Sequence, residues 1–373
     1  MKNKHISSLL STILVSIPLL TACDVGRELA RSAMDVVRNP QTDVGKQVLG
    51  SYSSKLKNLE FTCVKEQFPS LPQEADQLYR YALYHDFKNR WLPKPCVLDR
   101  YLPYYRIAAA NGHWQANLTL QEILLKSKDI NIETRERRGE GIYWNEKLMK
   151  ILPASAHYWW SLYIDVGYGP KHGADDSIIY LRKAADLGNA KAQYEVRELI
   201  MKIKDDASHS FRLKIRDKLQ ECAATQVFPD AGAAQMTAAT YDNRKDYQKA
   251  LFYSHQGVKA GMTASAQSVS RAFYTDNPQS QYKQWGIPED KERSRRYKII
   301  REFLVTHAHL KPELNVHDLD EIVPLPPAKL PSWDGKIAIQ RFVEGPAPAK
   351  PSDELVRRLA QQAGLDTNTG LPK

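Results

Sequence analysis

One short pattern occurs three times along the chain and constrains its fold more than any other feature. At Gly112, Gly188 and Gly261 a run of small residues leads to the glycine, and another small residue follows four positions later. Glycine tolerates the left-handed conformation that ends a helix, and small side chains let neighbouring helices approach closely. The glycines are 76 and 73 residues apart, which is twice a unit of about 37 residues. Such a period is typical of a solenoid of helical hairpins.

Degenerate copies of the pattern lie between the clear ones. Leu152–Ala156 and Asp230–Ala234 each lead into a stretch of helical character. The chain is therefore predicted to be all-α, a right-handed superhelix of helical hairpins followed by an extended proline-rich C-terminal segment. Helices of the array are expected to start near Ala116, Ala156, Ala192, Ala234 and Ser265.

The most complete unit spans residues 156–194, with a first helix over 156–163, a loop over 166–171 and a second helix over 176–188. This unit resembles the Sel-1-like repeats, which are relatives of the tetratricopeptide repeats. The resemblance is weaker over 230–275 and faint over 100–150. It implies a superhelix with a long concave surface, and surfaces of this kind usually bind proteins.

The segments outside the array differ from it in composition. Residues 59–106 are rich in tyrosine and interrupted by prolines, which favours a cap of helices and loops. Pro324–Pro331 cannot be helical because proline blocks the backbone ladder, whereas Pro351–Ala363 has the pattern of a short amphipathic helix. The predicted divisions are a signal peptide (1–22), a lipidated N-terminus and tether (23–58), an N-terminal cap (59–106), the repeat array (107–310) and a proline-rich C-terminal tail (311–373).

The first residues have the layout of a secretory signal, with a basic start, an apolar stretch and small residues before a cleavage site. The stretch is shorter than the ~20 residues that a spanning helix needs. Leu20–Cys23 resembles the bacterial lipobox, which implies that Cys23 is lipidated, with palmitate among its acyl groups, and becomes the mature N-terminus. Asp24 resembles an inner-membrane retention signal. The expected location is the periplasm, anchored by lipid, with the inner membrane favoured and the outer membrane left open.

Three cysteines remain besides Cys23. Cys63 and Cys96 flank one early segment and could form a disulfide in the oxidising periplasm, worth roughly 3–4 kcal/mol on the chain-entropy model; whether they are joined is left open. Cys222 would then remain as a small buried residue. No Cys-x-x-Cys pair occurs, so zinc and thiol-redox sites are disfavoured.

Charge and motifs narrow the functional classes. The formal charge is +10, and +8 without residues 1–22, which suits an acidic protein partner or anionic lipid; nucleic acid is excluded by the location. Common hydrolase, metalloprotease and phosphate-loop motifs are absent. Ser-x-x-Lys occurs at Ser54–Lys57 and Ser280–Lys283, without the motifs that accompany it in β-lactam-recognising enzymes. No enzymatic activity, cofactor, metal or catalytic residue is predicted.

Aromatic side chains and one histidine are the candidates for partner binding. The run around Tyr158 and Trp160 could face a partner, although helices of repeat proteins also bury aromatics against their neighbours. Trp333 could either anchor the C-terminal tail on the solenoid, which is the favoured interpretation, or insert into a partner. The candidate contacts are Tyr158, Trp160, Tyr168, His172 and Trp333.

The lipobox, the repeats and the tail motif Leu330–Lys336 together resemble the lipoproteins that accompany type VI secretion phospholipase effectors and serve as periplasmic immunity proteins. The resemblance implies a stoichiometric inhibitor that clasps a secreted lipase and occludes its substrate entrance or membrane-binding face. Two alternatives stay open. One is an envelope adaptor or assembly lipoprotein, and the other is a cell-wall or β-lactam-interacting protein, with Ser54 as its nucleophile.

Overall fold

The computed structural model describes residues 60–91, 97–126, 134–169, 176–204, 206, 208–311 and 313–373. These residues form helices, turns and extended segments, with no β-strand among them. The described residues belong to one compact unit. The α-helices are α3 (Gln73–Arg90), α4 (Leu102–Ala110), α5 (Trp114–Lys126), α6 (Thr134–Leu148), α7 (Pro153–Asp165), α8 (Asp176–Asp186), α9 (Ala190–Lys202), α10 (His209–Ala224), α11 (Ala231–Asn243), α12 (Tyr247–Lys259), α13 (Thr263–Phe273), α14 (Lys291–Thr306), α15 (Leu319–Ile322), α16 (Ala338–Glu344) and α17 (Asp353–Gln362), with short 3₁₀ turns η1 (Leu98–Arg100), η2 (Gln281–Trp285) and η3 (Ala308–Leu310).

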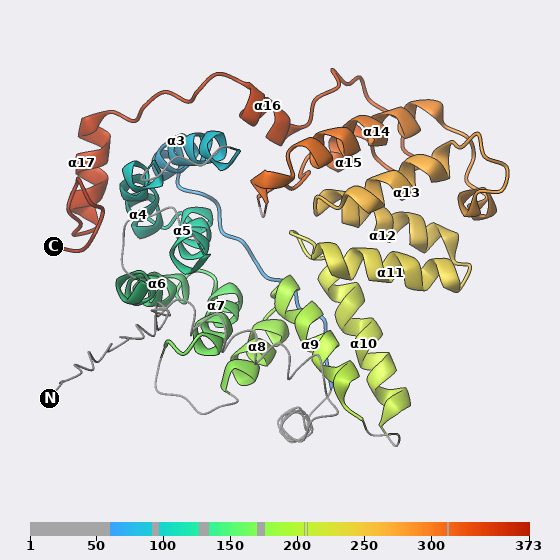
Figure 1. Cartoon of the computed structure of the whole chain (residues 1–373), viewed down its shortest axis with the longest axis horizontal. Helices are drawn as coiled ribbons and strands as arrows, with labels where there is room; N and C mark the ends of the chain where they lie inside the picture. The colour runs from blue at the N-terminus through green and yellow to red at the C-terminus, as the bar shows by residue number, and fades with distance from the viewer. Residues whose placement is uncertain are drawn as a thin grey trace, which may run out of the picture. The chain divides into compact units, whose positions relative to one another are not determined.

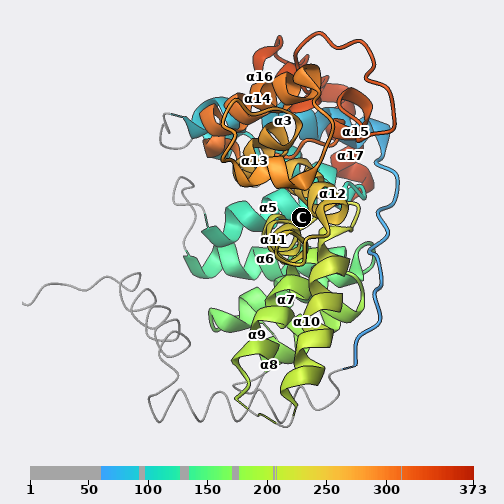
Figure 2. The same cartoon turned by 90° about the vertical axis from the view of Figure 1, so that its right-hand side faces the viewer.

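Consecutive helices pack as antiparallel neighbours from α3 to α14, each against the one before and the one after (Figure 1). This arrangement confirms the predicted all-α solenoid. Figure 2 shows the same succession from the side, with the extended N-terminal segment running along it. The cap, the array and the tail belong to one unit, and the boundaries drawn between them from the sequence stay predictions.

The three repeat glycines lie in the tight turns where they were predicted. Gly112, Gly188 and Gly261 have φ values of 86°, 107° and 76°, a region that side chains rarely adopt. In each case the next helix begins two residues later, at the start of α5, α9 or α13. The spacing of these glycines in the sequence thus marks the starts of alternate hairpins.

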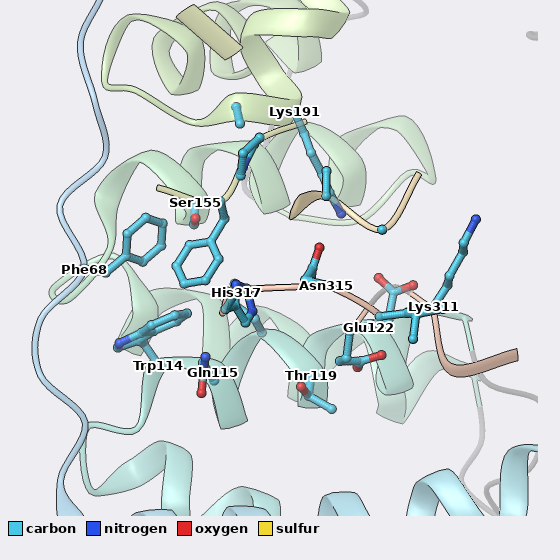
Figure 3. Close-up of a pocket in the computed structure, with 18 of the residues that line it drawn as sticks. Phe68, Trp114, Gln115, Thr119, Glu122, Ser155, Lys191, Lys311, Asn315 and His317 are labelled. Atoms are coloured by element: carbon cyan, nitrogen blue, oxygen red, sulfur yellow. The ribbon is translucent and has the colours of Figure 1, made fainter. Parts of the chain in front are cut away.

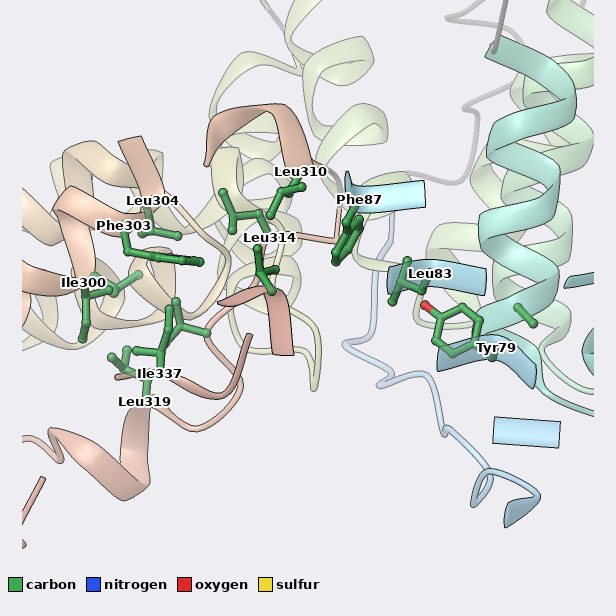
Figure 4. Packing of buried hydrophobic residues seen from close by; sticks show 14 of the residues in the cluster. Tyr79, Leu83, Phe87, Ile300, Phe303, Leu304, Leu310, Leu314, Leu319 and Ile337 are labelled. Atoms are coloured by element: carbon green, nitrogen blue, oxygen red, sulfur yellow. The ribbon is translucent and has the colours of Figure 1, made fainter. Parts of the chain in front are cut away.

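The largest hydrophobic cluster joins the two ends of the described chain. It contains residues of α3 to α5 and also residues of α11 to α17. Figure 4 shows Tyr79, Leu83 and Phe87 of α3 on one side and Leu310 and Leu314 of the C-terminal segment on the other. Because apolar burial drives folding, this shared core holds the C-terminal segment against the N-terminal helices.

The C-terminal segment leaves the array after α14 and returns to α3 and α4. Its proline-rich stretch, Pro324–Pro331, is not helical, and α17 follows it, both as predicted. Contacts of α16 with α3, and of α17 with α4 and α3, join the two ends. Trp333 is half-buried against the large cluster, its Nε1 donates to the Lys336 carbonyl (2.7 Å), and Arg296 lies over its ring. This supports its role as an anchor for the tail.

Within the described ranges no helix combines the length and the apolar character needed to cross a membrane. The predicted signal peptide, Cys23, Asp24, the tether and Ser54 lie outside those ranges.

Candidate functional site

A cavity of about 720 Å³ lies where the ends of many elements meet (Figure 3). It is bordered by α3, by one face of α5 and of α7, by the starts of α9 and α11, and by the turn before α13. Two irregular segments, around residues 66–68 and 311–317, and the short helix α16 complete its wall. In a stack of hairpins every second helix runs in the same direction, so their N-termini gather at one edge. The cavity is therefore a consequence of the repeat.

Side chains satisfy the backbone N–H groups at these helix starts. His113 Nδ1 accepts from Ala116 N (3.1 Å) at α5. Asn189 accepts from the amide of Ala192 (3.0 Å) at α9, and Asp230 accepts from the amide of Ala233 (2.8 Å) at α11. The polar groups around the cavity thus begin as helix caps.

Helix α7 is capped by a residue from far away in the sequence. Its own N-cap residue, Leu152, supplies no side-chain bond. Instead the carboxylate of Glu66 accepts from Ser155 N (2.8 Å) and Ser155 Oγ (2.9 Å), and Asn189 Nδ2 lies 3.4 Å from it. Glu66 is only 6% exposed, and burial raises its pKa. The N-terminal segment is therefore part of the cavity wall.

Aromatic rings form the wall beside Glu66. The ring of Phe68 lies 4.9 Å from that of Trp114 and 4.6 Å from that of Phe228. The ring of His317 packs edge-on against Phe228 at 5.0 Å, and burial lowers its pKa, so the neutral ring is favoured. Trp114 Nε1 donates to the Pro69 carbonyl (3.0 Å). These contacts make a fixed apolar surface in which Trp114 is held in place.

Five carboxylates line the cavity, and each is engaged within the protein. Their partners are Ser155 for Glu66, His113 for Asp76, Lys126 for Glu122, the first turn of α11 for Asp230, and Arg90 for Glu313. Lys191 and Lys311 differ, because both are exposed and neither has an ion-pair partner among the described residues. Figure 3 shows them at the cavity, one from the start of α9 and the other from the C-terminal segment. The charge of Lys191 acts on Asp230 and Glu195, where it opposes the rise in pKa that burial causes. Arg80, a third exposed cation at the cavity, lies over the ring of Phe342. These three side chains place positive charge at the exposed mouth.

Of the four predicted partner contacts that lie in the described ranges, Tyr158 alone lines this cavity. Its hydroxyl donates to Glu195 Oε1 (2.8 Å). Trp160 is 8% exposed and packs against Tyr163 and Tyr180, so it is a core residue rather than a partner contact, which corrects its assignment. Tyr168 is half-buried beneath Arg138. Trp333 borders a shallow depression together with residues of the 318–322 stretch and Arg341. His172 lies outside the described residues.

Sequence reasoning missed most of the cavity. Glu66, Phe68, Phe228 and His317 come from segments far apart in the chain, and no spacing pattern links them. Asn189 and Asp230 could have been found, because Asn and Asp directly before a predicted helix start are typical N-caps.

The suggested disulfide between Cys63 and Cys96 is wrong. Cys63 is bonded to Cys222, at a sequence separation of 159 and with 5.6 Å between their Cα atoms. The N-terminal segment runs beside the end of α10, so a partner distant in sequence is the one within reach. Cys96 lies outside the described residues.

No group of three or more His, Cys, Asp or Glu side chains in the described ranges is arranged to hold a metal ion. Most charged side chains at the cavity are joined to each other or to helix ends. The arrangement suits binding by shape, by apolar contact and by the charge of the two lysines.

Comparison with known proteins gives a family match over part of the chain. Residues 265–373 match a family described as a domain of unknown function (DUF6396). No curated protein matches the sequence significantly. Two solved structures are similar to this chain. One is titled Pseudomonas aeruginosa 5086 (PA5086), with 26% identity and a TM-score of 0.49, and the match covers 72% of this chain and 95% of that one. The other is the immunity protein Pa5087 from Pseudomonas aeruginosa, with 24% identity, a TM-score of 0.48 and the same coverage. With TM-scores below 0.5, these overall similarities are too loose to transfer a function.

Proposed function

We propose that this chain is a protein-binding solenoid that neutralises a secreted effector enzyme by stoichiometric binding. The observation that carries the proposal is the central cavity. It is formed in advance by helix starts and by the segments before α3 and after α14, it has a fixed aromatic wall, and exposed cations that include Lys191 and Lys311 lie at its mouth. A preformed concave surface binds with a smaller ordering cost than a flexible one.

The same site supports a role without catalysis. Ser155 is only 5% exposed, and its hydroxyl and amide both donate to the buried carboxylate of Glu66. A nucleophile needs access to a substrate and an adjacent base, and Ser155 is enclosed in a helix cap. The other carboxylates at the cavity serve caps and ion pairs.

The finer assignment is to periplasmic immunity against a type VI secretion phospholipase effector. It rests on the resemblance of the lipobox at Leu20–Cys23, the hairpin array and the tail motif Leu330–Lys336 to lipoproteins of that kind. A lipid anchor at Cys23 would place the solenoid at the membrane where a lipase acts, which raises its effective concentration there.

The test is crosslinked affinity purification of the tagged full-length chain from membranes of its own host, grown beside a sibling strain. We expect one tightly bound hydrolase whose toxicity to the host appears when the gene for this chain is deleted. Recovery of several resident envelope proteins and no hydrolase would reject immunity and favour an envelope adaptor.

A fractionation experiment tests the location separately. The wild-type chain is expected in the membrane fraction and a Cys23→Ala variant in the soluble periplasmic fraction. A Cys23→Ala variant that still carries lipid and sediments with membranes would contradict the proposed anchor.

A further inference from the structure

We infer that the central cavity receives a segment of the partner protein that carries an acidic side chain next to an aromatic or large aliphatic one. This inference rests on the proposed function and names the chemistry that the same site would recognise. It depends on three observations: the aromatic wall, the charged side chains at the mouth, and the contacts that hold the two irregular wall segments in place.

The apolar part of the site is large enough for more than one side chain. The cavity volume of about 720 Å³ lies within the ~300–1,000 Å³ of typical binding pockets. Phe68, Trp114 and Phe228 form one wall, and Leu118 and Leu162 extend it. A large apolar side chain that entered here would lose its contact with water, which is the main source of affinity at the centre of protein interfaces.

The charged side chains at the mouth of the cavity favour a partner segment of negative charge. Glu122 and Glu313 are paired with cations. Glu66, Asp76 and Asp230 are held by hydrogen bonds and are buried or half-buried, so they are less accessible to a partner than the exposed cations at the mouth. Lys191 and Lys311 are exposed and lack ion-pair partners among the residues that the structure describes. An acidic side chain entering beside them would form charge-assisted bonds. Because the lysines are exposed at the mouth, they also attract an acidic surface from a distance and speed its capture.

Both irregular segments of the wall are held in place before any partner arrives. Glu66 fixes the N-terminal segment to α7 and α9. Arg90 fixes the C-terminal segment by donating to the Leu310 and Lys311 carbonyls and to Glu313. The backbone that carries Lys311 is therefore set by Arg90, and little ordering is left for binding.

Site-specific photo-crosslinking in the host tests where the partner enters. Leu118, half-buried in the cavity wall, is replaced by p-benzoylphenylalanine in the full-length chain, and the matched control carries the same group at Ile179, which is 50% exposed on α8 and outside the cavity. We expect a crosslink from position 118 to a partner peptide in which Asp or Glu adjoins an aromatic or aliphatic residue, and none from position 179.

Charge reversal provides a second readout that does not depend on the bulky probe. The amount of partner that co-purifies with a Lys191→Glu/Lys311→Glu variant is expected to be lower than with the wild type by about tenfold or more. The difference should be largest at low salt. The control is Lys218→Glu/Lys329→Glu, which changes the net charge equally at two exposed lysines away from the cavity and should retain the partner.

The outcomes separate this inference from the proposed function. A partner that crosslinks at position 179 but not at 118, or that is retained by the Lys191/Lys311 variant, overturns the inference and leaves the proposed function standing. A crosslink from 118 to a lipid, or to residues 23–59 of the chain itself, also overturns it. Absence of any captured partner from either position and from the unmodified chain rejects the proposed function itself.

Discussion

Glu66 and Gly188 form one contact that places the N-terminal segment against the array. Gly188 has φ 107°, and a Cβ there would overlap the backbone nitrogen of Glu66. The close approach lets the Glu66 carboxylate reach the start of α7, while Gln226 accepts from the Glu66 backbone amide (3.2 Å). The absence of a side chain at Gly188 thus lets the N-terminal segment approach closely enough for Glu66 to cap α7.

The pH dependence of stability should report the buried carboxylate of Glu66. Its pKa is raised by burial, so the folded state binds a proton more readily than the unfolded state, and this residue's contribution to stability falls as pH rises above the ordinary value of 4.5. In a Glu66→Gln variant that dependence is removed. We expect the free energy of unfolding of the variant, relative to wild type, to increase between pH 4 and pH 7 by about 1.4 kcal/mol per unit of pKa elevation.

Urea unfolding of both proteins at the two pH values makes this measurement. If the free energy of unfolding of Glu66→Gln relative to wild type stayed constant or decreased between pH 4 and pH 7, the burial of Glu66 would be contradicted. Glu66→Ala serves as a second variant, because it leaves the Ser155 donors without an acceptor. It should lose roughly 1–3 kcal/mol.

Glycine substitutions separate the turn requirement from general helix propensity. Gly188→Ala should lose at least about 2 kcal/mol, because it combines a left-handed conformation with an overlap against Glu66. Gly139→Ala is the matched control, since Gly139 lies inside α6 with nothing within 4 Å of an added Cβ, and it should gain roughly 0.5–1 kcal/mol. Thermal unfolding of the two variants checks this, and equal effects would contradict the close contact.

At the scale of elements, the extended segment before α3 behaves as an additional layer on the hairpins. It contacts the turn before α9 through Glu66 and the start of α5 through the Pro69 carbonyl. The Cys63–Cys222 bond fixes its beginning to α10. Residues 60–72 of this segment form no helix before α3 begins, so they depend on these contacts for their position.

Removing the disulfide should therefore lower stability substantially. A bridge across 159 residues is worth up to about 5 kcal/mol on the chain-entropy model. Cys222→Ser is expected to lower the urea midpoint and to make the segment around Cys63 sensitive to protease, whereas Cys96→Ser should do neither. Peptide mapping of the unreduced chain should show the Cys63–Cys222 pair; a Cys63–Cys96 peptide would contradict the structure.

At the scale of the whole folded unit, the C-terminal segment joins the last helices of the array to the first. Arg90 of α3 bonds Asp86 and Glu313 (2.6 and 2.7 Å). Arg106 of α4 bonds Glu140 and the Thr369 carbonyl (both 2.7 Å). An open solenoid has contacts only between neighbouring repeats, whereas the bonds to Glu313 and to the Thr369 carbonyl join its first helices to the C-terminal segment. We therefore expect the ends to unfold together with the middle.

Arg90 is the residue whose loss should separate the ends. Arg90→Ala leaves the buried Asp86 and the partly buried Glu313 without their cation. Removing one partner of a fully buried pair costs roughly 3–5 kcal/mol, which is the upper limit for this site. The control is Arg358→Ala, because the Arg358–Glu74 pair joins α17 to α3 but is about half exposed; such pairs contribute about 0–1 kcal/mol. Limited proteolysis should release residues beyond 311 only from the Arg90 variant. Equal resistance would contradict the joined ends.

The hairpin array could be predicted from the sequence because its determinants are local. Gly112, Gly188 and Gly261 mark turns through their own backbone conformation, and Pro324–Pro331 excludes a helix whatever surrounds it. The final helix also follows from its own pattern and its Ser352 cap, whose side chain accepts from the amide of Leu355. For these features, neighbours along the chain supply the physical cause.

The cavity and the cysteine pairing were decided only by the tertiary structure. Glu66 caps α7 across 89 residues, and Cys63 reaches Cys222 across 159, so no local pattern records either contact. The repeat brings helix starts to one edge, but which side chains meet there depends on how far the array curves and where both ends return. The curvature of the array is the accumulated effect of packing many hairpins against one another, so the sequence of a single hairpin does not determine it.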